Sequence, residues 1–83
     1  MNANEYHFIR EKESFPRVPL ITRLAYMADG KLEYSGLARR GSATTDEAWL
    51  IEKFVYSNDQ LVQTLMSDFN QIWDNRETTV SYS

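Results

Sequence analysis

The chain has 83 residues, a formal net charge of −3, no cysteine, 42% apolar residues and 13% aromatic ones. This length allows one domain with a small core, and the lack of cysteine excludes disulfides and thiolate metal sites. The apolar and aromatic content argues against a disordered chain, and the negative charge argues against a general attraction to nucleic acid.

No apolar run reaches the roughly 18 to 20 residues that a membrane-spanning helix needs. The first 14 residues are mostly polar or charged, which does not fit a signal peptide. We therefore expect a protein made in a cytosol and used there, or in a particle assembled there.

Residues 1–19 are predicted to be an extended N-terminal arm that ends in a prolyl connector. Two prolines three positions apart hold the connector extended and exclude it from the interior of a sheet or helix. Two interpretations of the arm remain open. It is either a loosely ordered tail, or it is anchored on a neighbouring subunit by Tyr6 and Phe8, with Phe15 as a further contact.

The next segment predicts a β-hairpin with strands at residues 20–27 and 31–38. Asp29 and Gly30 lie between the two runs, and this pair is typical of a type I′ turn, in which both central residues have positive φ. Gly36, inside the second strand, is expected to mark a bulge or a bend.

The most apolar stretch, residues 48–56, has an ambiguous periodicity. A strand would place Trp49 and Ile51 on one face and Leu50, Phe54 and Tyr56 on the other. A helix is the alternative, because residues 44–47 satisfy the capping-box pattern. The aromatic and β-branched composition favours the strand.

The last third of the chain also allows two interpretations. Apolar residues recur at helical spacing from Leu61 to Trp73, which alone predicts a helix. Residues 57–60 fit either a hairpin turn or a helix N-cap. Residues 77–82 alternate in the manner of a terminal strand.

Several short motifs follow one another in order. They are a tyrosine-glycine-alanine strand (34–38), a small-residue loop (41–46), a W-x-I-x-K strand (48–53), an F-x-x-x-W-D-x-R segment (69–76) and the ending VSYS (80–83). In this order they resemble a group of small tailed-bacteriophage proteins regarded as virion structural components. The chain departs from that pattern at Arg39 and Arg40, where small residues or proline are usual, and at residues 65–68, which replace a glycine-rich loop.

The resemblance implies strand, loop and a single helical turn where periodicity suggests a long helix. We therefore predict an all-β domain over residues 20–83, a curled sheet or compact barrel. Its five antiparallel strands are expected at residues 20–27, 31–38, 48–57, 61–66 and 77–82, with a helical turn near 69–73. The alternative is an α+β fold with a helix at about 59–75.

Residues of structural importance are expected in the core and beside it. Trp49, Ile51 and Trp73 are predicted to be core residues. One expectation is that Asp74 caps the turn and pairs with Arg76. The other is that Arg76 lies across an indole such as that of Trp49 in a cation–π contact. A functional alternative is an ion pair between subunits. Arg39 and Arg40, with the face made by Leu50, Phe54 and Tyr56, are candidate contacts to other proteins.

The residues predict no catalytic, cofactor-binding or metal-binding site, because the single histidine, His7, has no partner suited to either chemistry. The resemblance implies a non-enzymatic virion structural protein, present in many copies, that joins or decorates capsid, neck or tail subunits. Its expected partners are other virion proteins and copies of itself, in a virion assembled in the host cytoplasm. The alternative is a cytosolic regulatory module that binds a host protein or nucleic acid.

Overall fold

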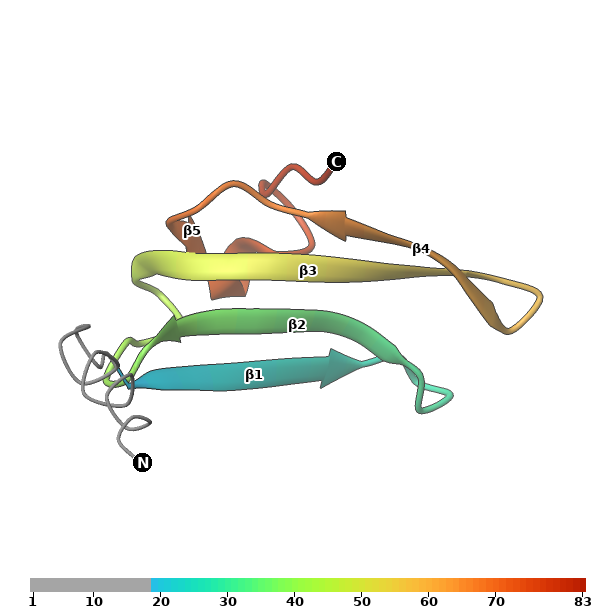
Figure 1. Cartoon of the computed structure of the whole chain (residues 1–83), viewed down its shortest axis with the longest axis horizontal. Helices are drawn as coiled ribbons and strands as arrows, with labels where there is room; N and C mark the ends of the chain where they lie inside the picture. Colours follow the sequence, from blue (N-terminus) through green and yellow to red (C-terminus); the bar gives the residue numbers. More distant parts are fainter. Residues whose placement is uncertain (1–18) are drawn as a thin grey trace, which may run out of the picture.

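The computed structural model describes residues 19–83, which form an open antiparallel sheet (Figure 1). Neighbouring strands follow the chain order β1 (Leu20–Tyr26), β2 (Leu32–Arg39), β3 (Glu47–Ser57) and β4 (Gln60–Met66). The two-residue strand β5 (Gln71–Ile72) also pairs with β3, and the 3-10 helix η1 (Trp73–Asn75) follows it. The β prediction is confirmed. Within the described residues the sheet does not close into a barrel, since β1 and β4 are its edges, and no α-helix occupies residues 59–75.

The first hairpin pairs β1 with β2, as predicted, but its turn is of a different type. A type I′ turn needs positive φ at both central residues, whereas only Gly30, with φ of 95°, has it here. The Gly30 N–H donates to the Met27 carbonyl at 2.9 Å. The turn therefore spans residues 27–30, and Gly30 supplies the left-handed residue that lets β2 begin with the correct twist.

The second hairpin has the geometry expected of the first. Asn58 and Asp59 form the two-residue loop between β3 and β4, and their φ values are 51° and 66°. Asn and Asp tolerate the left-handed region better than other residues with side chains. Of the two interpretations of residues 57–60, the hairpin turn is confirmed.

The tips of the two hairpins are linked by Lys31. Its ammonium contacts the carboxylates of Asp29 and, at 3.0 Å, Asp59. Asp29 raises the pKa of Lys31, with a further contribution from Asp59, and the Lys31 contact lowers the pKa of Asp29. The carboxylates are exposed, so we expect this link to orient the tips rather than to stabilise the fold strongly.

Strand β3 is the centre of the sheet. One of its edges pairs with β2, and its other edge pairs first with β5 and further along with β4. β4 and β5 are therefore successive parts of one interrupted strand. At the interruption Ser67 is buried; its N–H donates to the Ile51 carbonyl at 2.8 Å, and its hydroxyl accepts the Ile51 N–H at 2.9 Å.

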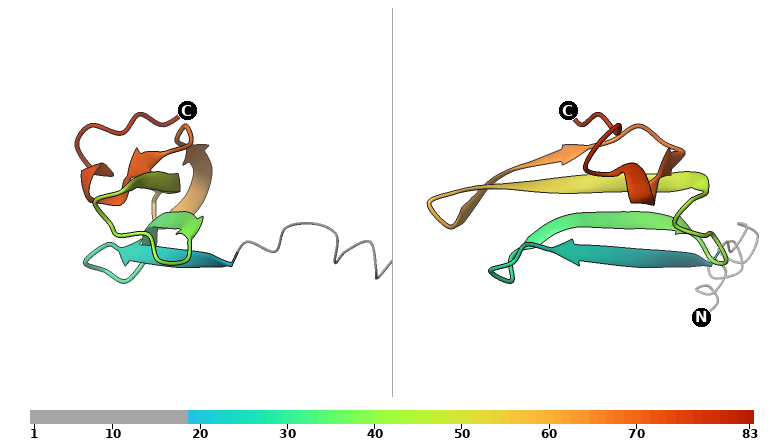
Figure 2. Two further views of the ribbon diagram at one scale, coloured as in Figure 1. Left: turned by 90° about the vertical axis from the view of Figure 1, so that its left-hand side faces the viewer. Right: turned by 180° about the vertical axis from the view of Figure 1, so that it is seen from behind.

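The chain after β5 covers one face of the sheet (Figure 2). The predicted strand at residues 77–82 is wrong, because Thr78 and Thr79 turn back and donate their N–H groups to the Asn75 carbonyl. Only Ser83 reaches a strand, where it exchanges two backbone hydrogen bonds of 3.0 Å with Met66. The predicted helical turn exists, but it begins at Trp73, where the prediction ended.

The core lies between the sheet and this C-terminal segment. It consists of Tyr34, Ala38, Trp49, Ile51 and Trp73, with Val80 and Tyr82 packed against them from the segment. The two indoles lie 5.6 Å apart with a 46° tilt. The Trp49 Nε1–H donates to the Ala43 carbonyl at 2.9 Å, which satisfies the polar atom of a fully buried ring.

Gly36 does not mark a bulge. It stays in register with Arg23 on β1 and with Ile51 on β3. The ring of Trp73 lies directly over its backbone. The glycine is explained by packing rather than by strand irregularity.

Candidate interaction surface

The C-terminal segment covers one face of the sheet and leaves the other face uncovered. Trp49 and Ile51 point into the core under the C-terminal segment, so their neighbours Leu50 and Glu52 point to the opposite face. No segment within residues 19–83 packs over that face. We call it the open face and define it by the residues that the register places on it: Thr22, Leu24, Ser35, Leu37, Leu50, Glu52, Phe54, Thr64 and Met66.

The open face exposes several large apolar side chains. Leu24 is 48% exposed, Leu37 40% and Met66 41%, while Leu50 and Phe54 are half-buried. These side chains come from four neighbouring strands, so they form one area rather than scattered single residues. Contiguous apolar areas of this kind usually mark contacts with another molecule.

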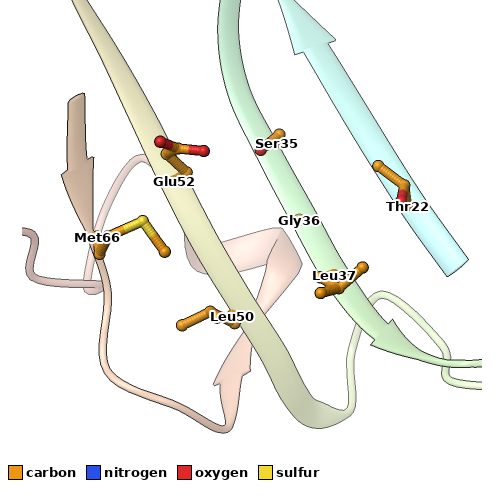
Figure 3. Close-up of a pocket in the computed structure, with 7 residues that line it drawn as sticks. All are labelled: Thr22, Ser35, Gly36, Leu37, Leu50, Glu52 and Met66. Carbon is orange, nitrogen blue, oxygen red and sulfur yellow. The ribbon is translucent and has the colours of Figure 1, made fainter. Parts of the chain in front are cut away.

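The middle of the open face is hollowed (Figure 3). The hollow has a volume of about 260 Å³ and is lined by Thr22, Ser35, Gly36, Leu37, Leu50, Glu52 and Met66. Ser35 contributes only a short side chain, and the rest of the lining comes from all four long strands of the sheet. Its shape suits a side chain of a partner.

Glu52 is the one charged residue of the hollow lining. It is half-buried, and none of the ion pairs or side-chain hydrogen bonds formed among residues 19–83 includes its carboxylate. A carboxylate in an apolar setting is best satisfied by a cation with its own apolar neighbours. The hollow therefore favours a basic, partly apolar partner.

The edge of β1 is a second place for contact. Within the described part of the chain, no strand pairs with its outer side. Leu20 and Tyr26 are 55% and 59% exposed, and the strand has a single charge, Arg23, and no proline. Open edges of this composition can accept a strand from another chain.

The candidate contact residues from the sequence do not lie together. Tyr6, Phe8 and Phe15 lie outside the described residues. Leu50 and Phe54 lie together on the open face.

Arg39 and Arg40 are exposed where β2 ends, and the Arg40 N–H donates to the Pro19 carbonyl at 2.9 Å. Tyr56 is half-buried near the other end of the sheet, and its hydroxyl donates to the Leu32 carbonyl at 2.7 Å. Tyr56 thus has an internal role that its grouping with Leu50 and Phe54 does not suggest.

Asp74 and Arg76 do not form the pair that we expected. The Asp74 carboxylate accepts the Thr44 hydroxyl hydrogen at 3.2 Å, and the Asp74 N–H donates to the Thr44 carbonyl at 3.1 Å. The nearest carboxylate to Arg76 is that of Glu77, at 3.8 Å. Asp74 therefore fixes η1 to the loop before β3.

Arg76 does lie over an indole, but the ring is that of Trp73, with the guanidinium carbon 4.7 Å from the ring centre. Trp73 precedes Arg76 by three residues, so the 3-10 turn itself brings the two together. Trp49, the indole named in the prediction, is not the partner, since the second ring near the guanidinium is that of Tyr34, at 5.8 Å.

Lys53, Tyr34 and Tyr82 form a cationic and aromatic cluster between the sheet and the C-terminal segment. The Lys53 ammonium lies 5.9 Å from the ring centre of Tyr34 and 5.8 Å from that of Tyr82. Burial raises the pKa of Tyr82 to about 12, and its hydroxyl donates to the Arg76 carbonyl at 2.9 Å. These contacts explain how a lysine is accommodated beside the core.

Of the nine residues of the open face, only Leu50 and Phe54 are candidates from the sequence. The apolar and charged residues that the sequence did not single out are Leu24, Leu37, Glu52 and Met66. The alternation that groups Leu50 with Phe54 also places Glu52 between them. Leu24, Leu37 and Met66 come from other strands. Finding them requires the register, which the turn types control.

Residues 19–83 hold no group of three or more metal-ligating side chains and no helix long and apolar enough to cross a membrane. Comparison of the chain with protein-family models, curated proteins and solved structures gave no match.

Proposed function

We propose that this chain is a non-enzymatic structural protein of a bacteriophage particle, present in several copies, that joins or decorates capsid, neck or tail subunits. The observation that supports an assembly role best is the open face. A sheet of this size covers one face with its own C-terminal segment and leaves the other face apolar and hollowed. Such a face is suited to a protein partner.

The energetics favour association. Leu24, Leu37 and Met66 retain roughly half of their exposure in the isolated chain. Covering each of them contributes about 1 kcal/mol, half of the usual value for a fully buried side chain of this size. A small domain with few buried residues is marginal by itself, so this contribution is large relative to its stability.

The assignment to a phage particle comes from the resemblance of residues 34–83. Three of the motifs lie in elements of the fold. The tyrosine-glycine-alanine motif is in β2, the W-x-I-x-K motif is in β3, and the tryptophan and aspartate of the F-x-x-x-W-D-x-R motif are in η1. The core residues Trp49 and Trp73 come from two of these motifs. The motifs are thus parts of one packed unit.

The experiment is mass spectrometry of purified, extensively washed phage particles from the host that carries this gene. We expect peptides of this chain at a copy number above one per particle, comparable with a capsid, neck or tail component. Absence from washed particles, with the protein present in the infected-cell lysate, would contradict the proposal.

A further inference from the structure

The hollow on the open face specifies the chemistry of its occupant. Leu37, Leu50 and Met66 form its apolar walls, and Glu52 is the charged residue that lines it. An occupant that satisfies both needs an apolar side chain followed closely by a basic one. The open face of a second copy does not fit this description, because its hollow has the same carboxylate and no basic residue.

The chain itself contains a segment of this chemistry. Residues 6–10 read Tyr-His-Phe-Ile-Arg. In an extended strand Tyr6, Phe8 and Arg10 point to the same side. This segment can place two aromatic rings and a guanidinium on one surface about 14 Å long.

The Pro19 carbonyl is held by the Arg40 N–H at the end of the sheet. The described part of the chain therefore begins at this end of the sheet, beside Arg40.

The register places Glu52 level with Leu24, so it lies about 13 Å beyond Leu20 along the sheet. Exchange of this segment between copies gives each copy one hollow and one binding segment, which is what a protein repeated in one assembly requires.

We propose that the hollow of one copy binds residues 6–10 of another copy, with Phe8 against Leu37, Leu50 and Met66 and with Arg10 paired to Glu52. The inference rests on the proposed function, since it requires several copies in one assembly. It adds the site and the binding segment. Repeated from copy to copy, such a head-to-tail contact closes into a ring or continues as a filament.

The test is a charge swap in the full-length chain, with self-association measured by sedimentation equilibrium. We expect Arg10→Glu and Glu52→Arg each to raise the dissociation constant about tenfold or more. The double variant Arg10→Glu/Glu52→Arg restores association to within a few-fold of the parent. Two controls carry the same charge changes elsewhere, Arg17→Glu and Glu47→Arg, and leave the constant near the parental value.

Circular dichroism of each variant checks that the sheet is intact, and Glu52→Gln is a milder variant that should also weaken association. The inference is overturned if the parent stays monomeric at every soluble concentration, if the swapped residues behave like the controls, or if the double variant is no better than the single ones. The proposed function fails separately, by absence of the chain from washed particles.

Discussion

Gly36 on β2 and Trp73 in η1 are in direct contact, and the contact depends on the missing side chain. A Cβ at position 36 would lie 2.5 Å from Cζ3 and 2.6 Å from Cε3 of Trp73, and 3.0 Å from Cε3 of Trp49. The indole of Trp73 therefore lies against bare backbone. The C-terminal segment thus packs on the face of the sheet where position 36 has no side chain, and the opposite face stays open.

Gly36→Ala should destabilise the domain by about 1 to 3 kcal/mol, since the added methyl overlaps a buried ring that cannot move away cheaply. The measurement is urea unfolding followed by tryptophan fluorescence. In the background Trp73→Leu, which removes the clashing ring atoms, the same glycine substitution should cost much less. Equal costs in both backgrounds would contradict the packing explanation.

Trp49→Ala should cost about 3 to 5 kcal/mol, because the ring is fully buried and its removal leaves a large cavity in a small core. We expect the isolated variant to be unfolded at room temperature by circular dichroism. Phe69→Ala is the control, since Phe69 is 74% exposed and its loss should change stability little. A Trp49→Ala variant that melts cooperatively near the parental temperature would place the ring outside the core.

Ser67→Ala should destabilise by about 1 to 3 kcal/mol, because the buried Ile51 N–H loses its acceptor where β4 and β5 are interrupted. Hydrogen exchange of the Ile51 amide should accelerate in parallel. Ser57→Ala, at the exposed end of β3, is the matched control and should be close to neutral. Unchanged Ile51 protection in Ser67→Ala would show that the hydroxyl is not the acceptor.

Stability should fall as the pH rises between about 10 and 12. Burial raises the folded-state pKa of Tyr82 to about 12 from an ordinary value of 10.0, and burial also raises the pKa of Tyr34. Above pH 10 the unfolded chain loses these protons before the folded one does, so its free energy drops relative to the folded state.

The Tyr82 contribution is thus complete below pH 10 and is lost by pH 12. Tyr82→Phe should flatten the plot of unfolding free energy against pH in this range, even though it also removes the hydrogen bond to the Arg76 carbonyl. An equally steep plot for the variant would assign the alkaline loss to other groups.

Local sequence signals predicted the strands well and the turns less well. Alternation, turn signals and β-branched composition placed β1 to β3 within one residue of their observed ends, whereas the strand at residues 61–66 was expected from the resemblance and against the local spacing. The helical spacing from Leu61 to Trp73 is misleading, because that span holds the edge strand β4, an interruption, the short strand β5 and the first residue of η1. The terminal strand was overestimated since Thr78 and Thr79 are bound to Asn75, a tertiary arrangement that alternation does not reveal.

The open face could be predicted only in part. Leu50 and Phe54 follow from the alternation of β3 alone. The hollow needs Leu37 beside Leu50 and Met66 beside Glu52, and these neighbours depend on the register of two hairpins. The sequence also does not show that the Glu52 carboxylate lacks a partner among residues 19–83. That depends on the tertiary structure, which decides the charged residues that lie near Glu52.

The central claim is that the open face is covered when the protein is in its assembly, and a single introduced thiol tests it most directly. The chain has no cysteine, so Leu37→Cys on the open face and Thr79→Cys on the exposed C-terminal segment each give one reactive group. The measurement is the rate of thiol labelling in the isolated variants and in purified particles. We predict that Leu37→Cys reacts readily in isolation and is protected in particles, while Thr79→Cys is protected less. Equal labelling of Leu37→Cys in both states would contradict the claim.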